Sequence, residues 1–550
     1  MVISIAGNKE LKAIIRDSLD LFNLKMLIFN FLTKIYQEKS LKKLNKIAKN
    51  TKKEIKIIKE KKKVLFNIVN GSYDQEIYRY GAIAKSLQFR GHSVEIMACG
   101  HALDICTAYF RIGHPPNNWT CKNCSDYFKS FCKIINLPCS TFTDYLTNED
   151  LRVIQQKINT LTIKECEKLN YKTVDVGKHA SLSANRYFKG IIPTKKEYEP
   201  ILRLELQAAM ISSLVAEKKY KKNKPDVVIS GSVYSPWATV SDYFRNQGIR
   251  VCHNNLGYLP QTLNVSDSES SFGDFKKYYN KIRGRKPLNE KEKQELYSFL
   301  KKRKSGKEGG GDTYLYGFIE KIKNLNEYFE TTKYEKTYAL FPNVPWDASL
   351  TGANKAFRDV YEWISYTIDL FEKNQNLQLI IKIHPGEKLS ESENTISDFI
   401  AKKYKNLSDN IIILPPDTKI SPYNLFSIIN AGIVYNGTPG IEMSLEGIPS
   451  IITGITHYRN LGFTNDVSSK NEYDEYIVKS KLKKPDTNLA EIYLYFFFIK
   501  TYLPINYVYF NSFVDLGWRV KSLDSFYPGN NKYLDKICDY IIDDGVLQDW

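Results

Sequence analysis

Short apolar runs alternate with amphipathic segments along most of the chain, and turn-forming residues bound many of the runs. Such runs, rich in Val, Ile and Leu, are typical of strands buried in a parallel sheet with helices between them. One series lies between residues 64 and 256, and a second lies between residues 338 and 453. A chain of 550 residues is too long for a single core. The pattern therefore predicts an α/β protein with two Rossmann-like domains.

The segment Tyr435–Asp466 carries the most informative pattern. The apolar run Ala431–Val434 leads into a turn of small residues, where a helix is expected to begin. Free N–H groups at the start of a helix that follows a parallel strand suit a phosphate, so Thr438 and Gly440 are predicted to bind one. Glu442, in the first turn, is predicted to accept hydrogen bonds from a ribose or sugar hydroxyl. The alternative is an ordinary strand–helix turn that binds no ligand.

A second strand end carries complementary chemistry. The apolar run Leu377–Ile383 leads into His384, and a period of two residues places Lys382 and His384 on the same side of the strand. A cation and an imidazole at this position form a second anion-binding group. The carboxyl ends of parallel strands open on one edge of a sheet. Lys382 and His384 are therefore predicted to share one donor site with the turn Thr438–Glu442.

Several segments follow one another in a characteristic order. They are FPNVPWDASL, FRDVYEWISYTI, IIKIHPGE, ILPPDTKISPYNLF, YNGTPGIEMSLEGIPSII and HYRNLGFTND. This order resembles capsule and surface-polysaccharide biosynthesis proteins of bacteria and archaea, which look like glycosyltransferases of the GT-B architecture. The C-terminal motifs are similar to those of Kdo transferases. The resemblance is dense over residues 335–480.

The resemblance implies a GT-B-like fold, in which two Rossmann-like domains enclose a cleft. It also implies a nucleotide-activated sugar as donor, whose phosphates are held by Lys382, His384 and the turn Thr438–Glu442. The predicted function is transfer of that sugar to a growing surface polysaccharide or lipid-linked glycan, with no cofactor required for the chemistry. Two alternatives stay open. One is a non-catalytic protein that binds a nucleotide or polysaccharide, and the other is a nucleotide-sugar epimerase or hydrolase.

The first domain opens with the strand Val64–Val69, a loop and a helix, but lacks Gly-x-Gly-x-x-Gly, so NAD is not predicted. In GT-B enzymes this half receives the acceptor and supplies any general base. Asp74, His101 and Asp104 lie near predicted strand ends where such a base acts. The alternative for each is a cap or turn residue. The segment Val174–Phe188 is predicted to be a polar, ligand-contacting loop.

The net charge of +18 is concentrated near the N-terminus, where residues 1–63 hold seventeen lysines or arginines against six acidic residues. Among anionic partners, a membrane surface or glycan is expected and a nucleic acid is not. The helix predicted over Ile14–Tyr36 has too short an apolar run to span a membrane. It is interpreted either as an amphipathic segment on the inner face of the cell membrane or as a helix packed on the first domain.

Six of the nine cysteines lie within residues 99–139, and Cys121 and Cys124 are spaced as Cys-x-x-Cys. One interpretation is a structural zinc site, and the other is a set of buried thiols. The zinc site would be completed by neighbouring thiolates or imidazoles: Cys99, Cys106, His101 or His114. Because no secretory signal is apparent, the cysteines indicate reduced thiols in a cytoplasmic protein.

Changes in composition suggest the domain boundaries. A charged stretch rich in Ser and Gly separates the two series of apolar runs, and the C-terminal segment is aromatic and helical. The predicted parts are a basic helical arm (1–62), an N-terminal acceptor domain (63–270), a charged linker or insertion (271–334), a C-terminal donor domain (335–488) and C-terminal helices that pack back on the N-terminal domain (489–550).

Overall fold

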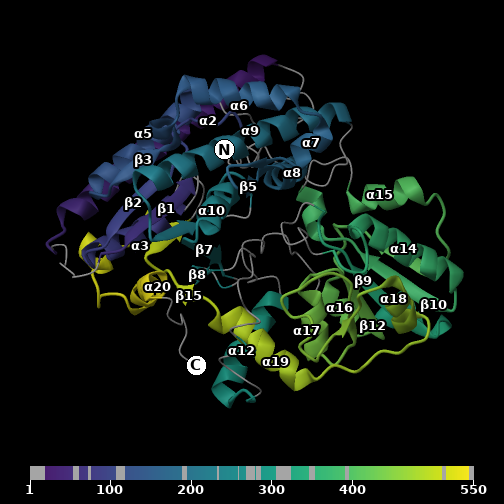
Figure 1. Cartoon of the computed structure of the whole chain (residues 1–550). Coiled ribbons are helices and arrows are strands. Elements are labelled where there is room, and N and C mark those ends of the chain that lie inside the picture. Colours follow the sequence, from purple (N-terminus) through teal and green to yellow (C-terminus); the bar gives the residue numbers. More distant parts are fainter. Residues whose placement is uncertain are drawn as a thin grey trace.

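A computed structural model of the chain shows two α/β units, each built on its own sheet (Figure 1). It describes most of the chain from residue 19 onward. The described residues are 19–53, 61–71, 76–106, 118–188, 195–231, 234–257, 259, 261–267, 279, 286–304, 324–345, 354–389, 395–510 and 516–543.

The first unit contains a seven-stranded sheet with the strand order β15-β8-β7-β6-β1-β2-β3. The strands from β7 to β3 are parallel, β8 is antiparallel to β7, and β15 is antiparallel to β8. The apolar run at Val64–Val69 forms β1, an interior strand of this sheet, and is buried throughout. The strands are β1 (Lys63–Val69), β2 (Ser93–Ala98), β3 (Cys139–Thr141), β6 (Val227–Ser230), β7 (Arg250–Leu256), β8 (Thr262–Ser266) and β15 (Leu503–Pro504).

Helices cover both faces of this sheet, as a buried parallel sheet requires. Successive side chains of β1 enter two different cores, because they point to opposite faces: Phe66 joins one core and Leu65 the other. The core around Phe66 includes α2 (Leu19–Lys49), α3 (Glu76–Phe89), α5 (Asn118–Ile134) and α20 (Lys532–Asp543). The core around Leu65 includes α6 (Asn148–Thr160), α7 (Ile163–Glu167), α8 (Val176–Tyr187), α9 (Lys195–Lys222) and α10 (Trp237–Asn246).

The second unit contains a six-stranded, fully parallel sheet with the order β11-β10-β9-β12-β13-β14. Its first five strands in the chain lie at the apolar runs that the sequence predicts, within one or two residues. The strands are β9 (Lys336–Phe341), β10 (Leu377–Lys382), β11 (Ile411–Leu414), β12 (Ala431–Val434), β13 (Ser450–Ile452) and β14 (Asn465–Asp466).

Two further cores cover the faces of the second sheet, one around Tyr338 and one around Ala339. The core around Tyr338 includes α14 (Val360–Lys373), α15 (Ile396–Lys403) and α18 (Lys470–Ile477). The core around Ala339 includes α12 (Glu290–Lys304), α13 (Leu325–Tyr328), α16 (Pro422–Phe426), α17 (Pro439–Leu445) and α19 (Thr487–Tyr495).

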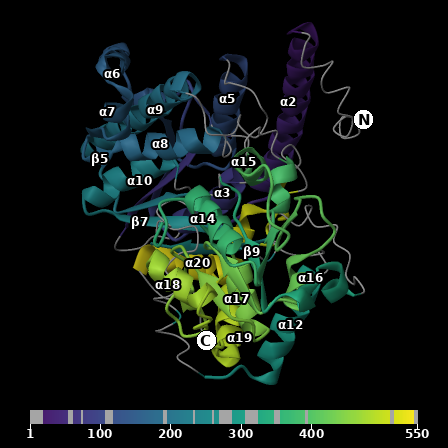
Figure 2. The same cartoon turned by 90° about the vertical axis from the view of Figure 1, so that its right-hand side faces the viewer.

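The C-terminal part of the chain connects the two units. Helix α19 and the π-helical turn Phe496–Lys500 pack in the second unit, and β15 then pairs with β8 of the first sheet. Helix α20 packs against α3, as Figures 1 and 2 show at the yellow end of the chain. Between β15 and α20, the chain forms a hairpin of β16 (Val508–Phe510) and β17 (Leu516–Trp518). Two α/β units with a returning C-terminal segment form the GT-B-like α/β fold that the resemblance implies.

Helix α2 extends beyond the range predicted from the sequence and packs on the first unit. Leu44 and Ile47 are buried in the same core as Phe66, and Ser40 Oγ lies 3.1 Å from the hydroxyl of Tyr127 in α5. The lysines of the same part of α2, among them Lys39 and Lys42, are exposed to solvent. Among the described helices, none combines the length and apolar character that a membrane crossing requires. The part of α2 that carries Leu44 and Ile47 thus packs on the first unit, and both interpretations of Ile14–Tyr36 stay predictions.

The prediction of a loop over Val174–Phe188 is wrong, because most of the segment forms helix α8. The side chain of Asp175 caps this helix by accepting a hydrogen bond of 3.0 Å from the N–H of Lys178. Gly177, Ala180 and Ala184 are buried, and α8 packs closely on α9. Tertiary packing has therefore overridden the local preference of Gly and Ser for turns.

Candidate functional site: the carboxyl edge of the second sheet

Three adjacent strands of the second sheet end at the same edge. Since β10, β9 and β12 are parallel neighbours, the residues that follow them lie close together. These residues are His384–Gly386 after β10, Asn343–Val344 after β9, and Asn436–Gly437 after β12. One strand, β9, therefore separates the predicted Lys-x-His strand end from the predicted glycine turn.

Lys382 is the last residue of β10 and is 3% exposed. Its Nζ atom donates a hydrogen bond of 3.1 Å to the carbonyl of Ile383. Burial lowers the pKa of this ammonium to about 8, and the charge of Asp417 acts in the opposite direction. A cation with this desolvation cost would be stabilised by a bound anion. The structure thus gives Lys382 a buried, largely desolvated environment, and its role in binding an anion stays a prediction.

The ring of His384 is oriented by its own loop. Its Nδ1 atom accepts a hydrogen bond of 3.0 Å from the backbone N–H of Gly386. In the neutral ring the proton is then on Nε2, which is a directional donor. A Cβ atom on Gly386 would lie 2.8 Å from His384 Nδ1 and 3.2 Å from Val344 Cγ1. Only glycine fits between the β10 loop and the β9 loop here.

Asn343 follows β9, the strand that lies between β10 and β12. Its Oδ1 atom is buried and has no hydrogen-bond partner among the residues that the structure describes. The same atom lies 3.8 Å from the position that a Cβ on Gly437 would occupy. An unsatisfied buried amide oxygen is costly, so a ligand that donates to it would be stabilised. Trp346 and Asp347, which follow in the same loop, lie outside the described residues.

The turn Thr438–Glu442 begins α17, but its contacts differ from the predicted ones. The N–H of Gly440 donates to the carbonyl of Gly437 at 3.3 Å. A Cβ atom on Gly440 would lie 2.5 Å from the hydroxyl of Tyr458 and within 3 Å of Ile452 and Val434 side chains. The glycine is therefore required for close packing of α17 on the sheet.

Glu442 is buried and its carboxylate is already paired. Arg303 of α12 lies 3.1 Å from Glu442 Oε1, and its Nη2 donates at 3.2 Å to Thr438 Oγ1. The hydroxyl of Tyr423 also donates to Glu442. Arg303 was not predicted as a site residue, because it lies in the range predicted to be a charged linker or insertion. The basic end of an amphipathic helix was the available signal, but it does not indicate where the helix packs.

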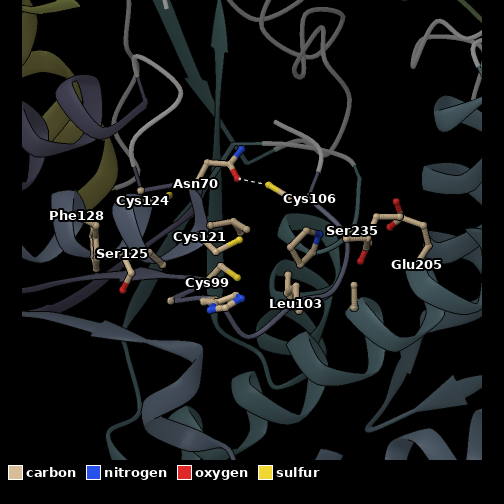
Figure 3. Close-up of a pocket in the computed structure, with 18 residues that line it drawn as sticks. Asn70, Cys99, Leu103, Cys106, Cys121, Cys124, Ser125, Phe128, Glu205 and Ser235 are labelled. Atoms are coloured by element: carbon tan, nitrogen blue, oxygen red, sulfur yellow. Dashed lines mark hydrogen bonds between the residues drawn. The ribbon is translucent and has the colours of Figure 1, made fainter. Parts of the chain in front are cut away.

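Two of the three candidate bases, His101 and Asp104, are described, and both lie in the first unit. Asp74 lies outside the described residues. His101 follows β2 with a positive φ of 71° and is exposed, and Asp104 is exposed as well. His101 also lines a pocket at the carboxyl ends of β1 and β2, which Figure 3 shows.

This first-unit pocket has thiols on one side and a carboxyl group on the other. Cys99 and Cys121 lie near one another in Figure 3, while Glu205 and Ser235 lie at the opposite end. Its eighteen lining residues are Val69, Asn70, Gly71, Ala98, Cys99, Gly100, His101, Leu103, Ile105, Cys106, Cys121, Cys124, Ser125, Phe128, Glu205, Ala208, Ser235 and Pro236. Glu205 was also not predicted, since in the sequence it resembles any other glutamate of an amphipathic helix.

Cys121 and Cys124 lie on α5, and neither forms a disulfide bond with a described residue. Burial and the neighbouring Cys99 raise the pKa of Cys121 to about 12. In the described part of the chain, no three His, Cys, Asp or Glu side chains are grouped in a way that holds a metal ion. His114 lies outside the described residues. The structural zinc therefore stays a prediction.

No family model and no curated protein sequence matches this chain. Solved structures that are similar include KpsC from Thermosulfurimonas dismutans, a beta Kdo 2,4 transferase, with 13% identity, a TM-score of 0.37 and coverage of 55% of this chain and 88% of that one. The glycosyltransferase SnogD from Streptomyces nogalater has 12% identity, a TM-score of 0.22 and coverage of 79% and 94%. A UDP-GlcNAc 2-epimerase from Methanocaldococcus jannaschii has 13% identity, a TM-score of 0.26 and coverage of 78% and 98%. Identities and TM-scores this low assign no activity.

Proposed function

We propose that this protein is a glycosyltransferase that moves a sugar from a nucleotide-activated donor to a surface-polysaccharide or lipid-linked glycan acceptor. One observation supports the proposal: Lys382, His384 and Asn343 stand at the ends of two neighbouring parallel strands, at the carboxyl edge of the sheet, and Asn343 lies near the turn at Gly437. Open α/β sheets bind their ligands at this edge. A buried ammonium and an oriented imidazole N–H suit the phosphates of a nucleotide.

The roles follow from the chemistry of each group. When the bond between the anomeric carbon and the phosphate breaks, negative charge develops on the leaving phosphate, and Lys382 would stabilise it. His384 would donate from Nε2 to a phosphate oxygen, and Asn343 would accept a hydrogen bond from the ligand. The nucleotide would lie beside Thr438, Gly440 and Glu442. Its ribose would be next to Glu442 and the partner of that residue, Arg303.

We further propose that the acceptor binds to the first unit. Lys39, Lys42, Lys46 and Lys49 of α2 are exposed and recur at helical spacing, so they form a basic face on the first unit. A basic helix face binds anionic lipid, on whose surface a lipid-linked acceptor is held. We therefore propose peripheral association with the inner face of the cell membrane.

Nucleotide binding and sugar turnover test the proposal. UDP and CMP are added to the purified protein in a thermal-shift assay, in which a nucleotide that binds the folded state raises the melting temperature. UDP- and CMP-activated radiolabelled sugars are then incubated with the protein and a membrane extract. Transfer of label to the extract supports the proposal. An altered sugar still attached to its nucleotide indicates an epimerase, free sugar indicates a hydrolase, and binding without turnover indicates a non-catalytic protein.

The matched variants are Lys382→Ala and Lys373→Ala. Lys373 is exposed at the end of α14, four residues before β10 begins, and so lies near the opposite edge of the sheet. We expect Lys382→Ala to weaken nucleotide binding while Lys373→Ala does not. Equal affinity in the two variants would show that the nucleotide is not held by Lys382.

A further inference from the structure

The carboxyl group of Glu205 lies in an unusual environment for an ionisable side chain. Glu205 is in the middle of α9 and is 1% exposed, and it lines the pocket shown in Figure 3. Its Oε1 atom has no hydrogen-bond partner among the described residues. A buried polar atom without a partner destabilises the fold. Such a group is a candidate for a functional role, because packing alone does not require it.

Ser235 is a second unsatisfied group in the same pocket. Its Oγ atom is buried and lacks a partner among the described residues, while its N–H donates to Ser183 Oγ at 3.1 Å. The other walls are mainly apolar or thiol-bearing, with Leu103, Phe128 and Cys121 among them. An alcohol complements a carboxylate and a hydroxyl together, because its O–H donates to the carboxylate and its oxygen accepts from the serine.

We propose that this pocket receives the hydroxyl-bearing end of the sugar acceptor, and that Glu205 accepts the proton of the reacting hydroxyl. The inference rests on the proposed glycosyltransferase function and adds its proton acceptor. The Glu205 carboxylate takes the proton from the acceptor O–H, and the acceptor oxygen forms a bond to the anomeric carbon. The bond from that carbon to the donor phosphate breaks, and the phosphate leaves with the bonding electron pair.

Burial supports this role by raising the pKa of the Glu205 carboxyl to about 8. Arg186 of α8 acts in the opposite direction, and its guanidinium lies over the ring of Tyr234 at 4.1 Å. The other titratable groups that line the pocket are four thiols and His101. Burial raises the pKa of Cys99 to about 11 and that of Cys121 to about 12, so these thiols hold their protons at neutral pH. A general base works best with a pKa near the operating pH.

Two readouts compare the parent with Glu205→Gln and with the control Glu199→Gln. Glu199 is on the same helix and pairs with Arg203 at 2.6 Å, outside the pocket. In infrared difference spectra between pH 7 and pH 9, the parent and the control should lose a protonated carboxylic acid band that Glu205→Gln lacks. At saturating donor, where the bound phosphate keeps Lys382 charged, the transfer rate of the parent should rise with pH through about 8. Glu205→Gln should be about a hundredfold to ten-thousandfold slower, with unchanged UDP and CMP affinity.

The outcomes separate this inference from the proposed function. If the parent transfers sugar and Glu205→Gln matches its rate and pH profile, the inference is overturned and the transferase function stands. If Glu205→Asp partly restores the rate with the same nucleotide affinity, the proton-accepting role is supported over a packing role. If the parent transfers no sugar from any UDP- or CMP-activated donor, the proposed function is overturned and the role of Glu205 with it.

Discussion

Arg303 in α12 and Glu442 in α17 form a buried ion pair at 3.1 Å, although 139 positions separate them in the sequence. Their side chains are 15% and 6% exposed. The guanidinium also donates to Thr438 and lies over the ring of Phe498 at 5.2 Å. Arg303, which precedes the second sheet in the chain, thus contacts both Thr438 and Glu442 at the first turn of α17. The sequence predicts nucleotide binding at this turn.

The first prediction concerns the stability that this pair provides. Glu442→Gln leaves the guanidinium of Arg303 buried without its counter-charge, so the free energy of unfolding should fall by about 3 kcal/mol. Urea denaturation measures the change. The control is Glu446→Gln on the same helix, whose partner Lys304 lies 2.5 Å away with both side chains about two-fifths exposed. That change should cost at most about 1 kcal/mol.

A double-mutant cycle completes this test. Arg303→Met removes the other partner, and the double variant should be more stable than the sum of the two single changes implies. Additive effects would show that the two residues do not stabilise one another. Among folded variants, Glu442→Gln should weaken binding of UDP or CMP more than binding of free pyrophosphate, if the carboxylate contacts the ribose.

The second prediction is the pH dependence of nucleotide binding. Burial lowers the pKa of Lys382 to about 8, so its positive charge is present below that pH and is lost as the pH rises through it. UDP or CMP affinity should therefore fall as the pH rises above about 8, with an upward shift of the midpoint when the anion is bound. Lys382→Met should bind roughly thirtyfold to a hundredfold more weakly at neutral pH, because a charge-assisted contact provides about 2–3 kcal/mol.

Calorimetric titration at several pH values measures this effect. Lys382→Met should show little change of affinity across the same range, and Lys373→Met should behave like the parent. An affinity that stays constant with pH in the parent would contradict a role for the Lys382 charge.

The third prediction follows from the orientation of His384. Because Nδ1 accepts from the N–H of Gly386, the neutral ring carries its proton on Nε2, and we propose that this N–H donates to a phosphate oxygen. His384→Phe keeps an aromatic ring but removes this donor, so nucleotide affinity should fall roughly tenfold to a hundredfold. His384→Gln retains an N–H donor and should recover part of the loss. If Gln binds no better than Phe, His384 acts by packing alone.

The sequence predicted most of the second sheet because its strands are continuous apolar runs with turn residues at their ends. It also placed Lys382 and His384 on one strand end, since a strand has a strict period of two residues. It did not reveal the partner of Glu442, because a helical period identifies the buried face of α12 without identifying what covers it. The burial of Glu205 was hidden for the same reason. The loop predicted over Val174–Phe188 failed because local Gly and Ser preferences are weaker than packing against α9.

The fourth prediction concerns the basic face of α2. Lys39 and Lys42 are exposed, whereas Leu44 and Ile47 are buried in the first core, so deletion of the whole arm would remove core residues. Substitution of both lysines by Gln tests membrane binding without that damage. Each lysine near an anionic surface contributes about 1 kcal/mol, so partition to liposomes should weaken roughly thirtyfold.

Sedimentation with liposomes that contain phosphatidylserine measures this partition. The matched control replaces Lys373 and Lys403, which are exposed on the second unit, by Gln. Equal sedimentation of the parent and the Lys39/Lys42 variant would contradict membrane association through this face. Nucleotide affinity should be the same in all three proteins, because neither pair lies at the edge that carries Lys382.

The last prediction ranks the cysteines by reactivity. Cys139 is exposed, and a hydrogen bond from Cys132 lowers the pKa of its thiol to about 7. Burial instead raises the pKa of Cys99 to about 11 and that of Cys121 to about 12. Because the thiolate is the reactive form, Ellman's reagent at pH 7 should modify Cys139 first, and Cys139→Ser should remove the fast phase.

The same measurement tests the predicted zinc, because a metal-bound thiolate is protected until the metal is removed. If Cys121 and Cys124 hold zinc, freshly purified protein should contain it in near-stoichiometric amount, and a chelator should expose additional reactive thiols and lower the melting temperature. If they are buried thiols, a chelator should change neither the number of reactive thiols nor the melting temperature. Cys124→Ser distinguishes the two cases further, since it would release zinc from a real site but leave the fast reaction of Cys139 unchanged.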